Sequence, residues 1–519
     1  MADQVFVGTV VLPDRIVDGG YVLVGDGLVQ AIGSGASPSG ERHGGNGFFV
    51  LPGAIDAQVH SRSQKGQEGF VWSTRSAAAG GVTTIVDMPY DDGCLIATAE
   101  RFGNKVSEAN LQSRVDFALY ATVDPQEGAA RIGELVDAGT AAFKFSTFGT
   151  HPQRFPRIPP QTLHACFSAI GPRGLFAGIH NESDEMVRAF TAEIQARGIT
   201  DYRAHGLSRP PITESLATAE VYELGADTGC PVHIVHCSIG RGYELAAAYR
   251  AQGHAATIEA CIHYLTLDEE NDVRRLAGKA KINPPLRSRR EVEALWHHLA
   301  AGNVTVVSTD HVSWSEDRKS DPDMLKNASG VPGLEVLYAL LIKGLSERNL
   351  PLTHAARLLA HNPAALFRIA HVKGALAVGR DADVVLMRTD SARNSEVRRL
   401  EVSTESARCR WWVPVSAANS TANREINRDF RRNRPSTPIF ASDQHADPIG
   451  YSRIPYATEQ GISKRVSGNF FKEQGNLVKL SNCSETADGR SATSVVAEAA
   501  NDLFSCWNFD FQYCYGRSR

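Results

Sequence analysis

The sequence has little of what marks disulfide-rich, membrane or nucleic-acid-binding proteins. Its nine cysteines occur without CxxC pairs, which argues against a zinc ribbon and a disulfide framework. No apolar run approaches the roughly 18 residues of a membrane span, and the first residues lack the basic start and apolar core of a signal peptide. A net charge of -4 does not indicate the excess of basic residues that binding to nucleic acid or to an anionic membrane requires. We therefore expect a cytoplasmic protein without nucleic-acid or membrane partners.

The 519 residues, 42% hydrophobic and 22% charged, suffice for a large globular domain and a smaller companion. Residues 1–50 alternate short apolar runs with Gly and Asp turns, which predicts antiparallel strands. From Leu51 onward, apolar strands alternate with longer helical segments, which favours a parallel sheet with crossover helices. Strand-like alternation returns at 371–390, so we expect a small β-sandwich domain formed from both chain ends.

Eight strands are expected between residues 51 and 370. Eight strands with intervening helices over about 300 residues match a (β/α)8 TIM barrel in number and size. The predicted strands are Ala54–His60, Thr84–Asp87, Val115–Ala121, Ala141–Phe145, Leu175–His180, Val232–Cys237, Ala256–Cys261 and Val304–Asp310.

The character of the chain changes after Asp390. Residues 391–519 carry a net charge of +4 against -8 for the preceding part, and they contain four of the nine cysteines. Much of this tail is polar and rich in Arg and Asn, without helical or strand periodicity, so we expect poor order apart from a short helix near 491–504. Two origins fit this tail: a novel extension, or a segment decoded in a different reading frame.

Several predicted strands end in residues that suit catalysis. Gln58 and His60, two apart on one strand, share a face. Imidazole and carboxylate groups gathered at one barrel mouth are typical of a zinc site, whereas each residue alone fits an ordinary structural role. The other members of this set are Lys144, which is costly to bury unpaired, His180, His236 and Asp310. His151, His164, His254 and His298 lack such a placement and are expected at the surface or in packing.

The chain resembles the cyclic amidohydrolases, a group that contains hydantoinases, dihydropyrimidinases, allantoinases and dihydroorotases. The similarity covers about residues 5–390, in the family's order. The matching words include "LPGAIDAQVH", "AAAGGVTTIVDMP", "FKFSTF", "IHNES", "HGLSRPPITES", "HIVHCS", "INPPLR", "STDHVSW", "GVPGLE" and "KGALAVGRDADVVL". The resemblance implies hydrolysis of a C–N bond in a cyclic amide such as a hydantoin, a dihydropyrimidine or allantoin. It also implies a homo-oligomer, either a dimer or a tetramer.

The resemblance further implies one or two divalent metal ions, most plausibly zinc. Lys144 would be carboxylated on its amine and would bridge the ions together with a hydroxide nucleophile, with the ions about 3.5–4 Å apart. One ion would be bound by His60, Lys144 and Asp310, and the other by Lys144, His180 and His236. Asp310 would also be the general acid and base. Gln58 takes the place of the first ion's other histidine.

Gln58 keeps alternatives open, because a neutral carboxamide oxygen binds zinc more weakly than imidazole nitrogen does. One alternative is a scaffold or oligomerisation protein with impaired catalysis, and another is a hydrolase with one metal ion and a shifted substrate, such as a linear amide. Substrate contacts are expected from Arg62, Asn283, Ser329 and Cys261. Tyr90, where dihydroorotases have Asn, counts against dihydroorotate.

Overall fold

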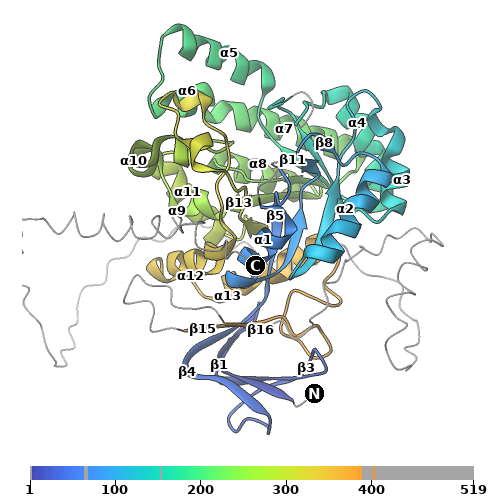
Figure 1. Ribbon diagram of the computed structural model, residues 1–519, viewed down its shortest axis with the longest axis vertical. Helices are drawn as coiled ribbons and strands as arrows, with labels where there is room; N and C mark the ends of the chain where they lie inside the picture. The colour runs from blue at the N-terminus through green and yellow to red at the C-terminus, as the bar shows by residue number, and fades with distance from the viewer. Residues whose placement is uncertain (1–2, 64–67, 152–154, 389–400, 404–519) are drawn as a thin grey trace, which may run out of the picture. The chain divides into compact units, whose positions relative to one another are not determined.

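The computed structural model describes residues 3–63, 68–151, 155–388 and 401–403, and the candidate site is positioned by eight parallel strands (Figure 1). These strands hydrogen-bond in the order β14-β13-β12-β11-β10-β9-β6-β5. A parallel bridge between Val59 and His311 brings the segment after β14 against β5. The chain is thus a (β/α)8 barrel, as expected. Its strands are β5 (Ala54–Val59), β6 (Val82–Asp87), β9 (Asp116–Ala121), β10 (Ala142–Ser146), β11 (Ala177–His180), β12 (Val232–Ile234), β13 (Ala256–Cys261) and β14 (Val306–Ser308).

All eight predicted strands are present, but three end earlier than expected, and β5 stops at Val59, one residue early. β12 stops at Ile234 and β14 at Ser308, so His236 and Asp310 lie just beyond their strands. Both residues have left-handed backbone conformations, with φ of 40° and 46°. Residues other than glycine adopt this region at a cost, and it interrupts the extended ladder. Two of the candidate site residues are therefore held by turns rather than by strands.

The barrel strands are buried on both faces, as a sheet covered by helices requires. Helix α2 begins after Thr98, whose hydroxyl accepts a hydrogen bond from the backbone of Arg101, and α7 begins with Pro211 at its first position. The helices are α1 (Gly69–Ala79), α2 (Ala99–Gln112), α3 (Ile132–Asp137), α4 (Pro160–Ile170), α5 (Asp184–Ala196), α6 (Arg203–Ser208), α7 (Pro211–Thr228), α8 (Gly240–Ala251), α9 (Ile262–Thr266), α10 (Arg274–Leu276), α11 (Arg289–Ala300), α12 (Leu337–Glu347), α13 (Thr353–Ala356) and α14 (Asn362–Leu366). A short hairpin, β7 (Tyr90–Asp91) and β8 (Cys94–Leu95), follows β6.

Both chain ends contribute to a separate six-stranded sheet with its own apolar core. Its strands run in the order β16-β15-β4-β1-β2-β3, with β1 and β4 parallel and the other neighbours antiparallel. They are β1 (Gln4–Val11), β2 (Ile16–Gly25), β3 (Leu28–Ser34), β4 (Glu41–Pro52), β15 (Val384–Arg388) and β16 (Glu401–Ser403). β16 comes from the range expected to be a tail, so the sheet takes one more strand than the sequence suggested.

A buried lysine ties this sheet to the barrel. The ammonium of Lys373 lies 2.6 Å from Asp116, at the start of β9, and 2.7 Å from Asp383, next to β15. Asp381 lies 3.4 Å from the same nitrogen. Burial is offset by these three carboxylates, which raise the pKa of Lys373 above its usual value. The segment "KGALAVGRDADVVL" thus supplies the lysine and two of the three carboxylates of an ion cluster between the sheet and the barrel.

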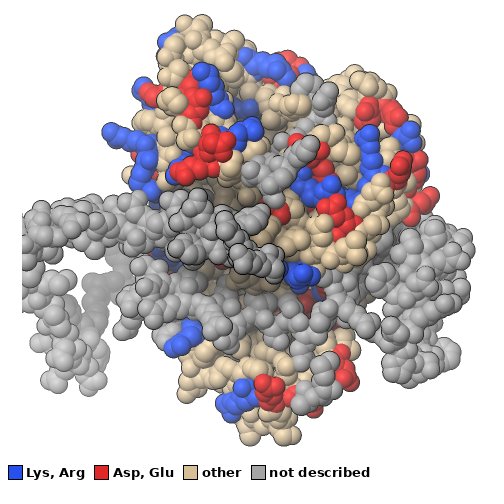
Figure 2. Space-filling view, viewed as in Figure 1, with Lys and Arg blue, Asp and Glu red and all other residues tan. Residues whose placement is uncertain are grey.

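No helix among the described residues is long and apolar enough to cross a membrane. Figure 2 shows Lys and Arg interspersed with Asp and Glu over the visible face of these residues. Residues 404–519, with Cys409, Cys483, Cys506, Cys514 and the helix expected near 491–504, lie outside the described part.

Candidate active site

The candidate residues meet at one pocket of about 710 Å³, at the carboxyl ends of the barrel strands. Lys144 comes from β10, and His180 ends the neighbouring strand β11. Gln58 comes from β5, and His60 directly follows that strand. All four line the pocket together with His236 and Asp310. The structure therefore brings together the whole set that the sequence suggested as metal ligands.

His180 and His236 form a pair at the floor of this pocket. The Nδ1 atom of His180 lies 3.0 Å from Nε2 of His236, and the two rings meet edge to face. The Nε2 atom of His180 lies 2.8 Å from the carboxylate of Glu182, which also accepts a hydrogen bond from Arg209. Glu182 thus accepts a hydrogen bond from the Nε2–H group of His180, and the lone pair of Nδ1 faces His236. Burial lowers the pKa of both histidines and keeps the imidazoles neutral.

Lys144 is buried within the apolar strand β10, and its amine has no hydrogen-bond partner among the described residues. Burial lowers the pKa of this amine to about 7, against an opposing effect of Asp310 and Glu259. An amine with such a pKa is about half neutral at pH 7 and largely neutral above pH 8. It can therefore react with carbon dioxide to give a carbamate, whose oxygens are metal ligands.

Gln58, His60 and Asp310 form a second group in the same pocket. The amide nitrogen of Gln58 donates a hydrogen bond of 2.7 Å to Oδ1 of Asp310. The Nε2 atom of His60 lies 3.2 Å from the same oxygen. The amide oxygen of Gln58 and the Nδ1 atom of His60 are buried without hydrogen-bond partners in the described part of the chain.

These side chains fit a metal ion unequally. Among the described residues, no three side chains of His, Cys, Asp and Glu are grouped to hold an ion. A carbamate on Lys144 would supply the missing donor beside the His180–His236 pair, and N and O donors of this kind suit zinc. Gln58, by contrast, directs its amide nitrogen, which has no free lone pair, at Asp310. With that carbamate the lysine–histidine group would fit an ion, and the Gln58 group fits less well.

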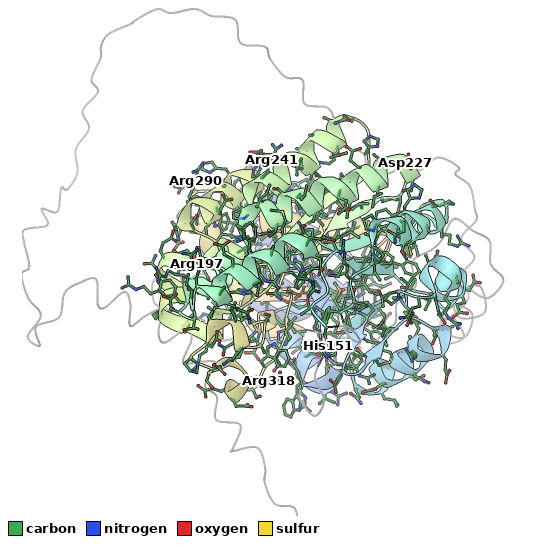
Figure 3. All side chains as sticks on the ribbon, turned by 90° about the horizontal axis from the view of Figure 1, so that it is seen from above. His151, Arg197, Asp227, Arg241, Arg290 and Arg318 are labelled. Carbon is green, nitrogen blue, oxygen red and sulfur yellow. The ribbon has the colours of Figure 1, made fainter. Side chains whose placement is uncertain are left out.

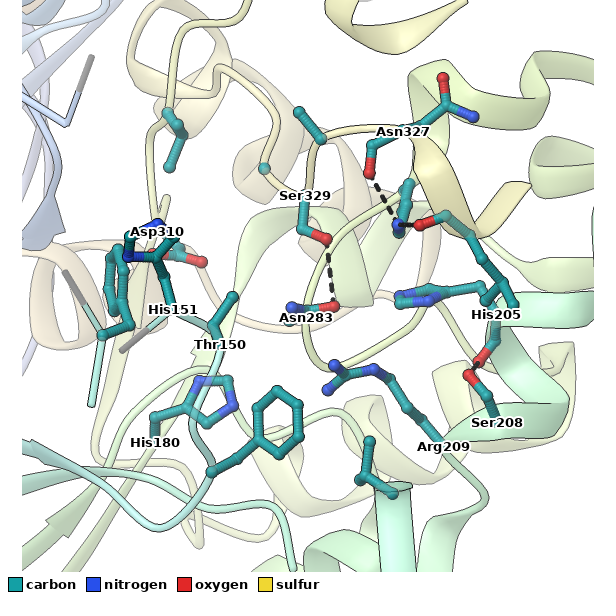
Figure 4. Close-up of a pocket in the computed structure, with 18 of the residues that line it drawn as sticks. Thr150, His151, His180, His205, Ser208, Arg209, Asn283, Asp310, Asn327 and Ser329 are labelled. Carbon is teal, nitrogen blue, oxygen red and sulfur yellow. Dashed lines mark hydrogen bonds between the residues drawn. The ribbon is translucent and has the colours of Figure 1, made fainter. Parts of the chain in front are cut away.

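The expected substrate-binding residues divide into two pairs. Asn283 and Ser329 line the pocket and are linked by a hydrogen bond of 3.2 Å from the Ser329 hydroxyl to Asn283 Oδ1 (Figure 4). Arg62 does not line the pocket: it forms ion pairs with Glu108 at 2.7 Å and Asp91 at 3.5 Å. Cys261 is fully buried against Ser308 and does not reach the pocket either.

Other pocket residues were not singled out from the sequence. His151, expected at the surface or in packing, is exposed and also lines the pocket, and Figure 3 places it inward of Asp227, Arg241 and Arg290. Arg209 lies 4.4 Å from the ring of Phe148 and reaches into the pocket (Figure 4). The loop after β10 could have pointed to His151, because loops after barrel strands carry site residues.

Known proteins that are similar to this chain include allantoinases and hydantoinases. The family model described as "Amidohydrolase family" matches residues 49–408, past the point near Asp390 where the sequence resemblance seemed to end. An allantoinase of Rubrobacter xylanophilus is 36% identical over 389 residues, covering 72% of this chain and 85% of the relative. An L-hydantoinase of Paenarthrobacter aurescens is 30% identical, covering 71% and 82%. The solved L-hydantoinase (dihydropyrimidinase) from Arthrobacter aurescens aligns with a TM-score of 0.69 at 29% identity, covering 75% of this chain and 86% of that one.

Proposed function

The chain belongs to the amidohydrolase family, and we propose that it hydrolyses the C–N bond of a cyclic amide. The relatives at 30% identity or more include allantoinases and hydantoinases, which supports a five-membered cyclic ureide as the substrate class. The observation that carries the proposal is the meeting of Asp310, Lys144, His180 and His236 in one pocket.

The ion is assigned to His180, His236 and a carbamate on Lys144. When bound, it would polarise the scissile carbonyl and lower the pKa of the attacking water. Neutral imidazoles are required for such ligation, and burial of both histidines favours that form. Glu182 fixes the tautomer of His180, so that its Nδ1 lone pair is available.

Asp310 is assigned the proton transfer. Its carboxylate accepts the proton of the attacking water as the new C–O bond forms, and returns it to the ring nitrogen as the C–N bond breaks. Asn283 and Ser329 line the same pocket, between Asp310 and His205 in the view of Figure 4, and are assigned to contact the substrate ring. Tyr90 and Phe148, which also line the pocket, supply flat apolar surface for a small ring.

The test is hydrolysis of allantoin, hydantoin, dihydrouracil and dihydroorotate by zinc- and bicarbonate-supplied protein, beside an Asp310→Asn variant. We expect turnover of at least one cyclic ureide, and a loss of about 10²–10⁴-fold in kcat/KM for the variant. Absence of turnover on all four substrates, with metal bound, would reject the proposal. The scaffold alternative, motivated by Gln58, predicts that result.

A further inference from the structure

The contact between Gln58 and Asp310 defines what Gln58 can do. Its amide nitrogen donates to Asp310 Oδ1 at 2.7 Å, and the Gln58 side chain is almost fully buried. Turning the amide over would place its oxygen against the carboxylate oxygen, and two acceptors at that distance repel each other. While Asp310 is ionised, Gln58 therefore presents an N–H group to it.

A second side chain from the same strand end lies close to the same oxygen. His60, two residues after Gln58 and on the same face, places Nε2 3.2 Å from Asp310 Oδ1. The backbone N–H of His60 also donates to the carbonyl of His311, the residue after Asp310, at 2.9 Å. The backbone of Asp310 is in the left-handed region, with φ of 46°, and this conformation costs free energy for a residue other than glycine. Two side-chain contacts and one backbone contact from this strand end thus hold the segment in place.

The lysine–histidine group is held differently, because His180 contacts Glu182 and His236 while other donor atoms of the group stay unpartnered within the described residues. The Lys144 amine and the Nδ1 atom of His236 are buried without hydrogen-bond partners in the part of the chain described here. The Nδ1 atom of His180 lies 3.0 Å from Nε2 of His236, and Lys144 lines the same pocket. The Gln58 group also has buried atoms unpartnered in that part of the chain, Oε1 of Gln58 and Nδ1 of His60, but a neutral carboxamide oxygen is a weaker zinc ligand than an imidazole nitrogen or a carbamate oxygen. The lysine–histidine group is therefore the better ion site.

We propose that Gln58 is a positioning residue for Asp310, and that the chain holds a single divalent ion, at Lys144, His180 and His236. This inference rests on the proposed hydrolase function. Asp310 then works as a carboxylate held by a hydrogen bond from Gln58, with the His60 ring close to the same oxygen. The reaction needs one ion and one held carboxylate.

The experiment counts zinc per chain by elemental analysis in full-length protein prepared with zinc and bicarbonate. The variants are Gln58→Met, which keeps the length but removes the donor, and Gln58→His. We expect one ion in the wild type, one in Q58M and two in Q58H. Two ions in the wild type would overturn the inference. If Q58M then held one ion, the buried Gln58 oxygen would be a ligand. If Q58M held two, His60 and Asp310 would be sufficient to bind the second ion without Gln58.

A kinetic readout separates positioning from a merely structural role. We expect Q58M to lower kcat about 10–100-fold with KM changed less than threefold, because the substrate contacts are intact.

Gln58→Glu places a second carboxylate against Asp310, and we expect the acid limb of the kcat/KM profile to rise by about one pH unit or more. Gln252→Ala, an exposed glutamine at the end of α8, is the matched control and should match wild type. An unmoved acid limb in Q58E would overturn the assignment, whereas a wild type without zinc or turnover would reject the proposed function itself.

Discussion

The Oε2 atom of Glu182 accepts a hydrogen bond from Nε2 of His180 at 2.8 Å and another from the guanidinium of Arg209. Burial alone would raise the pKa of Glu182, but the guanidinium of Arg209 and the His180 ring lower it below its usual range. The carboxylate is therefore ionised throughout the working pH range. An ionised partner fixes the tautomer of His180 and raises the basicity of its free nitrogen.

Glu182→Gln should consequently weaken zinc binding by about 10–100-fold. The amide keeps the shape of the side chain but loses the charge that holds the His180 proton. Competition with a chromophoric chelator measures the affinity, and Glu193→Gln, exposed on α5, is the control. Unchanged zinc affinity in E182Q would remove His180 from the ligand set.

Lys144 should take up carbon dioxide with a pH dependence set by its lowered pKa. With a pKa of about 7, the neutral amine rises from about a tenth of the population at pH 6 to about nine-tenths at pH 8. At constant dissolved carbon dioxide, the carbamylation rate of metal-free protein should rise over this range and level off above it. Labelled bicarbonate and carbon NMR follow the adduct, which should be missing in Lys144→Met. A rate that keeps rising tenfold per pH unit to pH 9 would contradict the assigned pKa.

Lys373→Met should destabilise the fold strongly. The variant leaves Asp116, Asp381 and Asp383 buried together without their cation, and breaking a buried ion pair in this way costs about 3–5 kcal/mol of unfolding free energy. The pKa of Asp383 is already raised by burial and would rise further. Folded protein would then bind more protons than unfolded protein in mildly acidic solution, so the deficit should shrink as pH falls from 7 to 5. Urea unfolding measures both effects, with Lys343→Met on the exposed face of α12 as control.

Sequence patterns predicted the elements better than the ends of the elements. A lysine inside "TAAFKFSTF" signalled a functional group because burying an unpaired cation is costly, and Lys144 is indeed buried in a strand. Period-two alternation placed Gln58 and His60 on one face, whereas Arg62 was expected to contact substrate only by resemblance. β5 ends at Val59 and the chain turns at residues 61–63, so Arg62 does not continue the face of Gln58 and His60. Local periodicity carries no signal for such a turn.

Contacts between distant residues were beyond the reach of sequence patterns. Glu182 and Arg209 are 27 residues apart, and nothing in either segment shows that they meet. The left-handed turns at His236 and Asp310 depend equally on tertiary contacts, because neither residue type requires positive φ. The set of candidate ligands was thus predictable, whereas the partners that orient them were not.

Arg62→Met tests the correction to the expected substrate contacts. Since the guanidinium is engaged by Glu108 and Asp91 outside the pocket lining, kcat/KM for a cyclic ureide should change less than about twofold. Steady-state kinetics on two ureides that differ in charge provide the measurement. A selective loss of activity on the anionic one would return Arg62 to substrate binding.

Ser329 should act on substrate affinity through Asn283. Its hydroxyl donates to Asn283 Oδ1, so the amide nitrogen of Asn283 turns away from Ser329 and can donate to a ring carbonyl. Ser329→Ala removes a hydrogen bond worth about 1 kcal/mol and should raise KM about fivefold with kcat nearly unchanged. Asn283→Ala should give a larger effect, since it removes the donor itself. Ser320→Ala, an exposed serine whose hydroxyl bonds only locally to Asp317, is the control. Equal KM values in S329A and wild type would show that Asn283 is held by other contacts or does not touch the substrate, and the Asn283→Ala value decides between these.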